Sequence, residues 1–283
     1  MTGSQQVALR LRGRISTTSV YLVLTVAAAF SVAPLLLVAI GSFRATSEIH
    51  QSPAGLPTGL SLDNYVTAWQ DASMSTYFVN SAIVTVSAVL LCLTVSTMAA
   101  YAFSRFSFPL QTALIALTVA GVVIPARVGL LPLFNIFKSM GLIDSLPALA
   151  VLYAAEAVPF SILLLMTFFH VVPDELFEAA RLDGANEGRV FWSVVLPQMR
   201  PSLAVVAIFQ FAPIWNDFFY PLVFLRDTEK YTLPVGLTSF FGQFSTDLGV
   251  LFAGLMLALT PVVILFVFLT KQIVSGLTAG MGK

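Results

Sequence analysis

Residues 72–104 read ASMSTYFVNSAIVTVSAVLLCLTVSTMAAYAFS, a stretch of 33 residues that contains no Asp, Glu, Lys or Arg. A helix crosses the hydrocarbon core of a bilayer with about 20 apolar residues. Because this stretch is longer than that, it predicts a membrane-spanning helix. Three further runs without a charged residue also exceed this length, namely Ile15–Phe43, Phe106–Ala126 and Leu248–Thr270.

The composition of the whole chain agrees with these runs. Of 283 residues, 58% are hydrophobic and only 10% are charged, whereas charged residues make up about 25% of an ordinary soluble domain. These values exclude a soluble single domain and a disordered chain, and the single Cys92 excludes a disulfide scaffold. The 14 basic and 14 acidic residues balance, so we expect a lipid bilayer as the surroundings and no nucleic acid as a partner.

Apolar length and helix breakers together predict an all-α, polytopic membrane protein with six transmembrane helices. The expected spans are Val20–Phe43, Tyr77–Phe103, Pro109–Phe134, Ser145–Phe169, Pro201–Phe224 and Leu248–Thr270. An even number of spans places both termini on one side of the membrane. The outer segments 44–76 and 226–247 contain several Pro and Gly residues and are expected to be loops.

The orientation follows from the distribution of Lys and Arg. With both termini inside, the inner segments carry nine of these residues and the outer segments carry four. The inner ones are Arg10, Arg12, Arg14, Arg105, Arg181, Arg189, Arg200, Lys271 and Lys283, and the outer ones are Arg44, Lys138, Arg226 and Lys230. Short cytoplasmic loops carry an excess of Lys and Arg. We therefore expect a multi-pass protein of the cell membrane with both termini in the cytoplasm.

A polar segment between the fourth and fifth spans, residues 170–200, reads HVVPDELFEAARLDGANEGRVFWSVVLPQMR. Pro173 is tolerated at the start of a helix, and the acids that follow it favour the helix dipole. Gly184 is placed to end this helix in a left-handed conformation. Asn186 is expected to cap a second helix, which Pro197 ends. The segment therefore predicts two short helices joined by a sharp glycine bend.

This segment resembles the EAA loop of the permease subunits of bacterial ABC importers. The matching positions are Glu178-Ala179-Ala180, Gly184, Val194, where Ile is usual in the family, and Leu196-Pro197. Beyond the loop, residues 77–271 are similar to the six-span partner of the maltose-type carbohydrate permeases. The stretches that carry this similarity are Asn80-Ser81, Ala100–Phe103 with Arg105, Pro132–Phe134, Pro159-Phe160, Trp215–Phe218 and Gly276–Thr278.

The resemblance implies the ABC importer type-1 transmembrane fold, in the bacterial inner or plasma membrane, with three parts along the chain. Residues 1–76 would hold a cytoplasmic tail, the first helix and the first outer loop. Residues 77–271 would form the transmembrane domain with the EAA loop at 170–200, and residues 272–283 a cytoplasmic tail. The residues implied to couple this loop to an ATPase are Glu178, Ala179, Ala180, Asp183, Gly184, Leu196 and Pro197.

The same resemblance implies three protein partners. These are a homologous second permease subunit, a dimer of ATP-binding subunits, and an extracytoplasmic solute-binding protein, toward which segment 226–247 would reach. The chain has no P-loop, no GxSxG or GxGxxG motif, and no His or Cys cluster with metal-ligand spacing. We therefore expect no catalytic residue, metal or cofactor in this chain, with ATP and Mg bound by the separate ATPase.

Three ionisable residues fall inside the expected spans, namely Arg127, Glu156 and Asp217. Each costs about 2.5–3.5 kcal/mol on insertion scales, which makes each a functional candidate. With Asn216 they are the candidates for the wall of a polar route through the helices. A purely structural ion pair between packed helices explains them equally well, and the resemblance assigns no role to Glu156.

The position of Arg127 leads to two further expectations. It lies between Pro125 and Pro132, so the third span is expected to be broken there. Counted from a turn near Gly141, Arg127 and Glu156 fall at similar depths in antiparallel spans. Their opposite charges therefore predict that they pair.

The function that fits these features is that of a permease subunit, one half of the pathway of an ATP-driven ABC importer for a carbohydrate, either an oligosaccharide or a sugar derivative. One alternative is a stand-alone carrier driven by an ion gradient, although the repeat symmetry between halves that is frequent in carriers is not evident. A second alternative is an ABC permease for a solute other than a sugar, such as a glycerol-phosphate ester.

Overall fold

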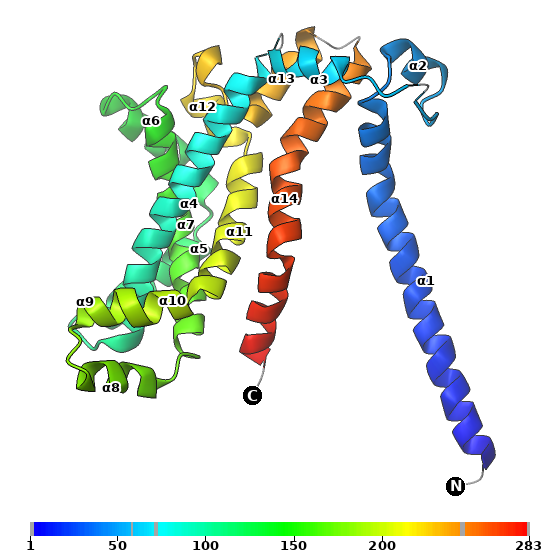
Figure 1. Cartoon of the computed structure of the whole chain (residues 1–283). Helices are drawn as coiled ribbons and strands as arrows, with labels where there is room; N and C mark the ends of the chain where they lie inside the picture. Colours follow the sequence, from blue (N-terminus) through cyan, green and yellow to red (C-terminus); the bar gives the residue numbers. More distant parts are fainter. Residues whose placement is uncertain (1–2, 58, 71–72, 244–246, 282–283) are drawn as a thin grey trace. The chain divides into compact units, whose positions relative to one another are not determined.

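The computed structural model describes residues 3–57, 59–70, 73–243 and 247–281 (Figure 1). Every regular element among these residues is a helix, which confirms the all-α prediction. The chain divides into two compact units, which are described separately. One comprises residues 1–72 and 240–257, and the other comprises residues 73–239 and 258–283.

The first unit contains α1 (Gly3–Gly41), α2 (Thr46–Gln51), α3 (Asp63–Gln70) and the first turns of α14 (Leu248–Met281). Segment 44–76 is therefore partly helical, and the prediction of a loop is wrong at α2 and α3. Its Pro and Gly residues lie between these two helices. Asn64 Nδ2 donates to the main-chain oxygens of Ser42 and Arg44, both at 2.9 Å. These bonds satisfy carbonyls just past the end of α1, where a helix has no partners of its own.

In the second unit, α4 (Met74–Arg105) packs along α7 (Leu146–Phe169), and α5 (Gln111–Val123) and α11 (Arg200–Asn216) lie beside them (Figure 1). Small side chains of α4 are completely buried there, including Ala88, Cys92 and Ser96. Small residues let helix backbones approach closely in a membrane, and polar side chains bridge the helices. Gln210 Nε2 of α11 accordingly donates to Ser161 Oγ of α7 at 3.0 Å.

The third expected span is broken, as predicted. After α5 ends at Val123, a 3₁₀ turn, η1 (Ala126–Gly129), leads into α6 (Leu130–Ser139). The two arms of this span meet at 82°. Because α5 has 13 residues, it is about 20 Å long, which is shorter than the hydrocarbon core of about 30 Å.

The fifth expected span is also broken, which the sequence did not predict. α11 ends at Asn216, and α12 (Phe219–Phe224) begins a few residues later. Asp217 between them has an extended backbone, and its Oδ2 accepts a hydrogen bond from the main-chain N–H of Tyr220 at 3.0 Å. The carboxylate thus caps α12, so a new helix starts instead of the old one continuing.

Within the part of the chain that the structure describes, four helices are long and apolar enough to cross a membrane, namely Thr17–Gly41, Met74–Arg105, Leu146–Phe169 and Leu248–Phe268. The number rises to six if two bent pairs each count as one span. These pairs are Gln111–Val123 with Arg127–Ser139 and Glu187–Gln198 with Arg200–Asn216. The six expected spans agree with the upper count. Both α1 and α14 extend beyond their expected spans into the expected tails.

Segment 226–247 contains η3 (Thr228–Lys230) and α13 (Leu233–Gln243), so the prediction of a loop is wrong here too; residues 244–246 lie outside the described residues. Pro234 stands in the first turn of α13, where the N–H that it lacks has no helical partner anyway. Gly236 is needed for close packing, because a Cβ there would lie 2.1 Å from the ring of Tyr77.

Candidate functional site

The polar segment 170–200 lies at one end of α4 and α7 (Figure 1). Its first helix, α8 (Asp174–Leu182), follows Pro173 and has Asp174 and Glu175 in its first turn, as predicted. Phe177 is the buried side chain of α8 and packs into a cluster with the ends of α4 and α7. One face of α8 is thereby fixed to the helix bundle, and the other remains open.

The open face of α8 carries several of the candidate coupling residues. Glu178, Ala179 and Asp183 are exposed, and Ala180 is half-buried. Leu182 beside them is 89% exposed. These candidate coupling residues are therefore accessible from outside the helix bundle.

The bend after α8 has the predicted conformation. Gly184 has a φ of +79°, and nothing lies within 4 Å of a Cβ added there, so backbone conformation alone requires glycine. Asn186 caps the next helix, with its Oδ1 accepting from the main-chain N–H of Arg189 at 2.9 Å. The two-helix prediction is confirmed up to this point.

The second helix continues further than predicted. It consists of α9 (Glu187–Arg189), a π-helical stretch η2 (Val190–Val195) and α10 (Leu196–Gln198). Pro197 does not end it, and the chain turns only at Met199, bending by 71° into α11. The wide π-helical turn before Pro197 carries a bond from Leu196 N to Phe191 O. This wider turn relieves the clash that a proline ring makes in a regular α-helix.

Arg105, in the last turn of α4, holds α8 in place. Its Nη2 donates to the main-chain oxygens of Phe169 and Val172, both at 2.9 Å, and its Nη1 pairs with Asp174. The guanidinium also lies 3.9 Å from the ring centre of Phe177. One side chain therefore joins α4, the end of α7 and the start of α8.

A second set of bonds joins the two helices across the glycine bend. Arg181 Nε of α8 donates to Glu187 Oε1 of α9 at 2.9 Å, and Tyr101 of α4 bonds to the other oxygen at 3.3 Å. The hydrogen bond from Arg181 lowers the pKa of Glu187 and, in return, raises the pKa of Arg181. Glu187 is therefore ionised at neutral pH.

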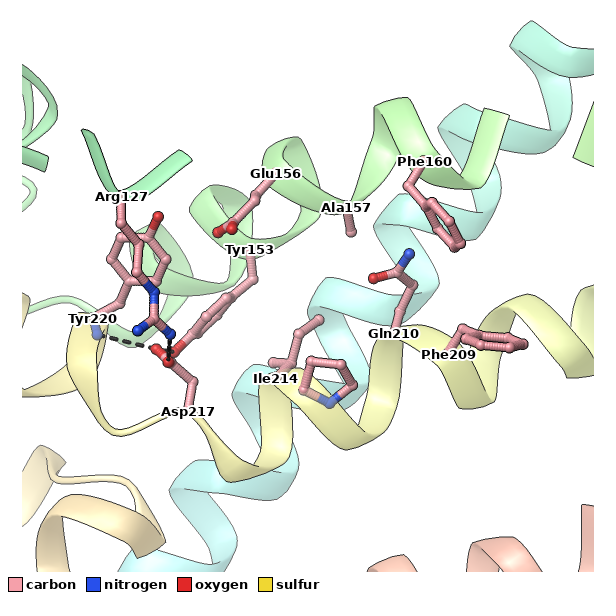
Figure 2. A pocket seen from close by; sticks show the side chains of 11 residues that line it. Arg127, Tyr153, Glu156, Ala157, Phe160, Phe209, Gln210, Ile214, Asp217 and Tyr220 are labelled. Carbon is pink, nitrogen blue, oxygen red and sulfur yellow. Dashed lines mark hydrogen bonds and ion pairs between the residues drawn. The ribbon is translucent and has the colours of Figure 1, made fainter. Parts of the chain in front are cut away.

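A pocket of about 350 Å³ lies between α7 and α11 (Figure 2). It is lined by Arg127, Tyr153, Glu156, Ala157, Phe160, Phe209, Gln210, Pro213, Ile214, Asp217 and Tyr220. Its volume falls in the range of about 300–1,000 Å³ that small-molecule sites occupy. Three of the four candidate pathway residues, Arg127, Glu156 and Asp217, meet in this pocket.

Asp217 is the centre of the polar end of the pocket (Figure 2). Its Oδ1 lies 2.9 Å from Arg127 Nη2, and its Oδ2 accepts from the Tyr153 hydroxyl at 2.8 Å as well as from Tyr220 N. The predicted pairing of Arg127 with Glu156 is therefore wrong. Similar depth was correctly inferred, but the break after α11 turns the Asp217 carboxylate toward Arg127.

The other two candidates have different surroundings. Glu156 is exposed and lines the pocket, as does Tyr220. Asn216 does not line the pocket, because its Nδ2 donates to the main-chain oxygen of Ala212, one turn back at 2.9 Å. Among the described residues, no group of three His, Cys, Asp or Glu side chains could hold a metal ion.

The sequence reasoning missed most of the uncharged lining. The pocket lining follows helical spacing, with Tyr153, Glu156, Ala157 and Phe160 on one face of α7 and Phe209, Gln210, Pro213 and Ile214 on one face of α11, followed by Asp217 just past the end of α11. Positions three, four and seven apart share a helix face. Extending that spacing from Glu156 and Asp217 would have identified this lining.

The opposite end of α4 anchors segment 226–247. Asn80 Nδ2 donates to the main-chain oxygens of Glu229 and Tyr231, at 2.8 and 3.0 Å. Ser81 Oγ accepts from Leu233 N at 2.7 Å. The Asn80-Ser81 pair was noted only as part of the resemblance, and its bonds give it a definite structural role.

Asp144, in the turn between α6 and α7, braces the same segment. Its Oδ1 accepts from the main-chain N–H groups of Arg226 and Asp227, at 3.0 and 3.1 Å, and its Oδ2 pairs with Lys230 at 2.7 Å. The main-chain bond from Arg226 and the bond from Lys230 lower the pKa of Asp144 to about 2. The Asp144 carboxylate, which forms the junction between this turn and segment 226–247, is therefore ionised throughout the neutral pH range.

Comparisons with known proteins agree with this architecture. Residues 93–282 match the model of the family described as binding-protein-dependent transport system inner membrane component. The chain is 36% identical over 251 residues to the diacetylchitobiose uptake system permease protein NgcG of Streptomyces coelicolor, covering 88% of this chain and 83% of that protein. It is 34% identical over 254 residues to the arabinooligosaccharides transport system permease protein AraQ of Halalkalibacterium halodurans, covering 88% and 90%.

A solved structure has the same fold. A chain of a bacterial ABC transporter involved in the import of the acidic polysaccharide alginate superposes with a TM-score of 0.80 at 24% identity. The match covers 91% of this chain and 96% of that one. The expected fold, that of an ABC importer membrane subunit, is therefore confirmed.

Proposed function

The chain belongs to the family of binding-protein-dependent transport system inner membrane components, and from this premise we propose that it forms one half of the pathway of a carbohydrate importer. The names of NgcG and AraQ support an oligosaccharide or a sugar derivative as the solute. A pocket with apolar rings at one end and hydrogen-bonding groups at the other suits a sugar, which presents both kinds of surface.

The observation that carries this proposal is the continuity between the pocket and the polar segment 170–200. α7 supplies Tyr153 and Glu156 to the pocket, and its last residue, Phe169, supplies a carbonyl that accepts a hydrogen bond from Arg105. Arg105 in turn holds α8. A force applied to the exposed face of α8 would thus reach the wall of the pocket through one packed set of helices.

In the proposed assembly, the face of α8 around Glu178 docks on a dimer of ATP-binding subunits, which bind ATP and Mg and carry out the hydrolysis. A homologous second permease subunit completes the pathway. Segment 226–247, fixed by Asn80 and Asp144, faces the extracytoplasmic solute-binding protein. Both termini then lie in the cytoplasm, with residues 77–271 as the transmembrane domain.

Reconstitution tests this function against the stand-alone carrier. The permease pair is placed in vesicles with the ATPase and the binding protein, and the labelled sugar is followed with and without ATP. We expect uptake only when ATP, ATPase and binding protein are all present. Accumulation by the purified chain alone, driven by an ion gradient, would establish the carrier instead.

Cysteine labelling tests the orientation. The native Cys92 is buried, so the background with an impermeant thiol reagent is low. Gly59→Cys, in the first outer segment, is expected to react in intact cells. Glu175→Cys, in the exposed first turn of α8, is expected to react only after the cells are opened. The opposite pattern would reverse the topology.

A further inference from the structure

The charges of the ionisable side chains that line the pocket do not cancel. It contains one guanidinium, that of Arg127, and two carboxylates, those of Glu156 and Asp217. Arg127 and Asp217 neutralise each other at 2.9 Å. The ion pairs between described residues do not include Glu156, so the pocket carries one acid beyond neutrality (Figure 2).

The two carboxylates are not equally available to a ligand. Asp217 is 9% exposed, and both of its oxygens already accept bonds from Arg127, Tyr153 and Tyr220. Glu156 is exposed, and its carboxylate takes part in none of the ion pairs between described residues. The carboxylate that faces a solute in this pocket is therefore that of Glu156.

The opposite end of the pocket carries two aromatic rings, with the Gln210 side chain near them (Figure 2). The rings of Phe160 and Phe209 lie with their centres 6.3 Å apart and tilted by 55°. Aromatic rings supply large apolar contact area, and a few placed polar groups fix the orientation of a ligand. A sugar ring fits this layout, with its C–H face on the phenyl rings and its hydroxyls at Glu156 and Arg127.

Charge then restricts which sugars fit. A carboxylate or phosphate on the solute would meet the extra negative charge of Glu156, and like charges brought together in a partly desolvated site repel. Arg127 offers little compensation, because its charge is already paired with Asp217. A neutral hydroxyl or an ammonium group, by contrast, donates a hydrogen bond to the Glu156 carboxylate.

We propose that Glu156 is a solute-binding residue that makes this pocket accept neutral and amino-bearing sugars and reject uronic acids and sugar phosphates. The proposal rests on the proposed function, since it names the class of solute for the same pathway. It also argues against the glycerol-phosphate ester as the solute, because that ester carries the charge that the pocket repels.

The test measures the binding of sugars to the permease complex, assembled with its ATPase in lipid nanodiscs. The binding protein is left out, so that any preference among sugars comes from the permease pathway alone. Three β-1,4-linked disaccharides serve as probes, namely cellobiose, the diamine chitobiose and cellobiouronic acid. Binding is followed by saturation-transfer NMR, which detects weak association. We expect cellobiose and chitobiose to bind and the uronic acid to bind at least tenfold more weakly.

Two substitutions assign the effect to Glu156. Glu156→Gln keeps the shape and a carbonyl acceptor but removes the charge, and it is expected to bring the three affinities to within about twofold. Glu156→Asp keeps the charge and is expected to keep the discrimination. Asp63→Asn, which removes an acid far from the pocket in the sequence and outside its lining, serves as the control and is expected to leave the order unchanged.

The outcomes separate this inference from the proposed function. Equal binding of the uronic acid by the unaltered complex, or unchanged discrimination in Glu156→Gln, overturns the inference. Absence of all disaccharide binding, while ATP-driven uptake of sugar persists in vesicles, also overturns it and leaves the proposed function intact. Failure of ATP-driven uptake in the complete system counts against the proposed function itself.

Discussion

Arg105 at the end of α4 and Asp174 at the start of α8 form an ion pair in which the two partners have very different surroundings. The Arg105 side chain is 15% exposed, whereas that of Asp174 is 79% exposed. Arg105 also serves two main-chain oxygens of the segment after α7. The ion pair is thus only the exposed part of a larger junction.

This difference predicts unequal effects of removing each partner. Asp174→Ala breaks an exposed ion pair, worth about 1 kcal/mol or less. Arg105→Ala also strands two carbonyls, at about 1–3 kcal/mol for each buried group left without a partner. We expect Arg105→Ala to lower the thermal unfolding midpoint and to reduce the sugar transported per ATP hydrolysed, and Asp174→Ala to do neither strongly. Equal effects of the two variants would show that Arg105 contributes only through its ion pair with Asp174.

The glycine bend offers a matched pair of substitutions. Gly184→Ala forces a residue with a Cβ into a φ of +79°, which costs about 1–2 kcal/mol. Gly188→Ala, four residues away in α9, meets only Asn186 Oδ1 at 3.6 Å and improves the helix propensity by about 0.5–1 kcal/mol. We expect Gly184→Ala to insert in the membrane but to lose ATP-driven uptake, and Gly188→Ala to retain it. Similar uptake by both would show that the bend does not transmit the motion.

The features that the sequence predicted correctly are those set by local chemistry. Gly184 and Asn186 determine a bend and a cap within a few residues, and Pro125 breaks the third span within one turn. The apolar runs likewise determine their own helices, because a backbone in lipid must satisfy its hydrogen bonds internally.

The features that the sequence did not predict depend on distant partners. The break at Asp217 depends on Arg127 and Tyr153, which contribute from two other segments. Helix α13 depends on Ser81 and on the approach of Gly236 to Tyr77. Composition alone reads Pro and Gly as loop formers, although Pro234 stands at a helix start, where it is well tolerated.

The Asp144 junction predicts a pH dependence with a definite sign. Because the folded pKa of about 2 lies below the ordinary value of 3.8, the carboxylate contributes stability that is fully present above about pH 4 and is lost as the pH falls toward 2. We expect the protection factors of the Arg226 and Asp227 amides to be constant from pH 8 to 5 and to fall below pH 4. Asp144→Asn is expected to lower protection at neutral pH and to abolish this pH dependence. A wild-type profile that stays flat down to pH 2 would contradict the role assigned to Asp144.

The last prediction distinguishes the observed partner of Arg127 from the one that the helix positions suggested. Arg127→Ala leaves the Asp217 carboxylate, which is 9% exposed, without its cation, whereas the Arg127 side chain itself is 63% exposed. A buried charge left without its partner is more costly than the loss of both partners. Adding Asp217→Asn removes the stranded charge while the side-chain oxygen can still bond to Tyr153 and cap α12. We therefore expect the double variant to recover about 1–3 kcal/mol of the loss, a coupling typical of residues in contact.

The matched control for this cycle combines Arg127→Ala with Glu156→Gln. Because Glu156 makes no ion pair with Arg127, neutralising it still leaves the Asp217 carboxylate without its cation, and the recovery is expected to be smaller than with Asp217→Asn. Thermal unfolding of the purified permease complex measures all the variants on one scale. If Glu156→Gln recovers stability in the Arg127→Ala background and Asp217→Asn does not, Arg127 pairs with Glu156. That result would exclude the Arg127–Asp217 ion pair, on which the charge balance of the pocket depends.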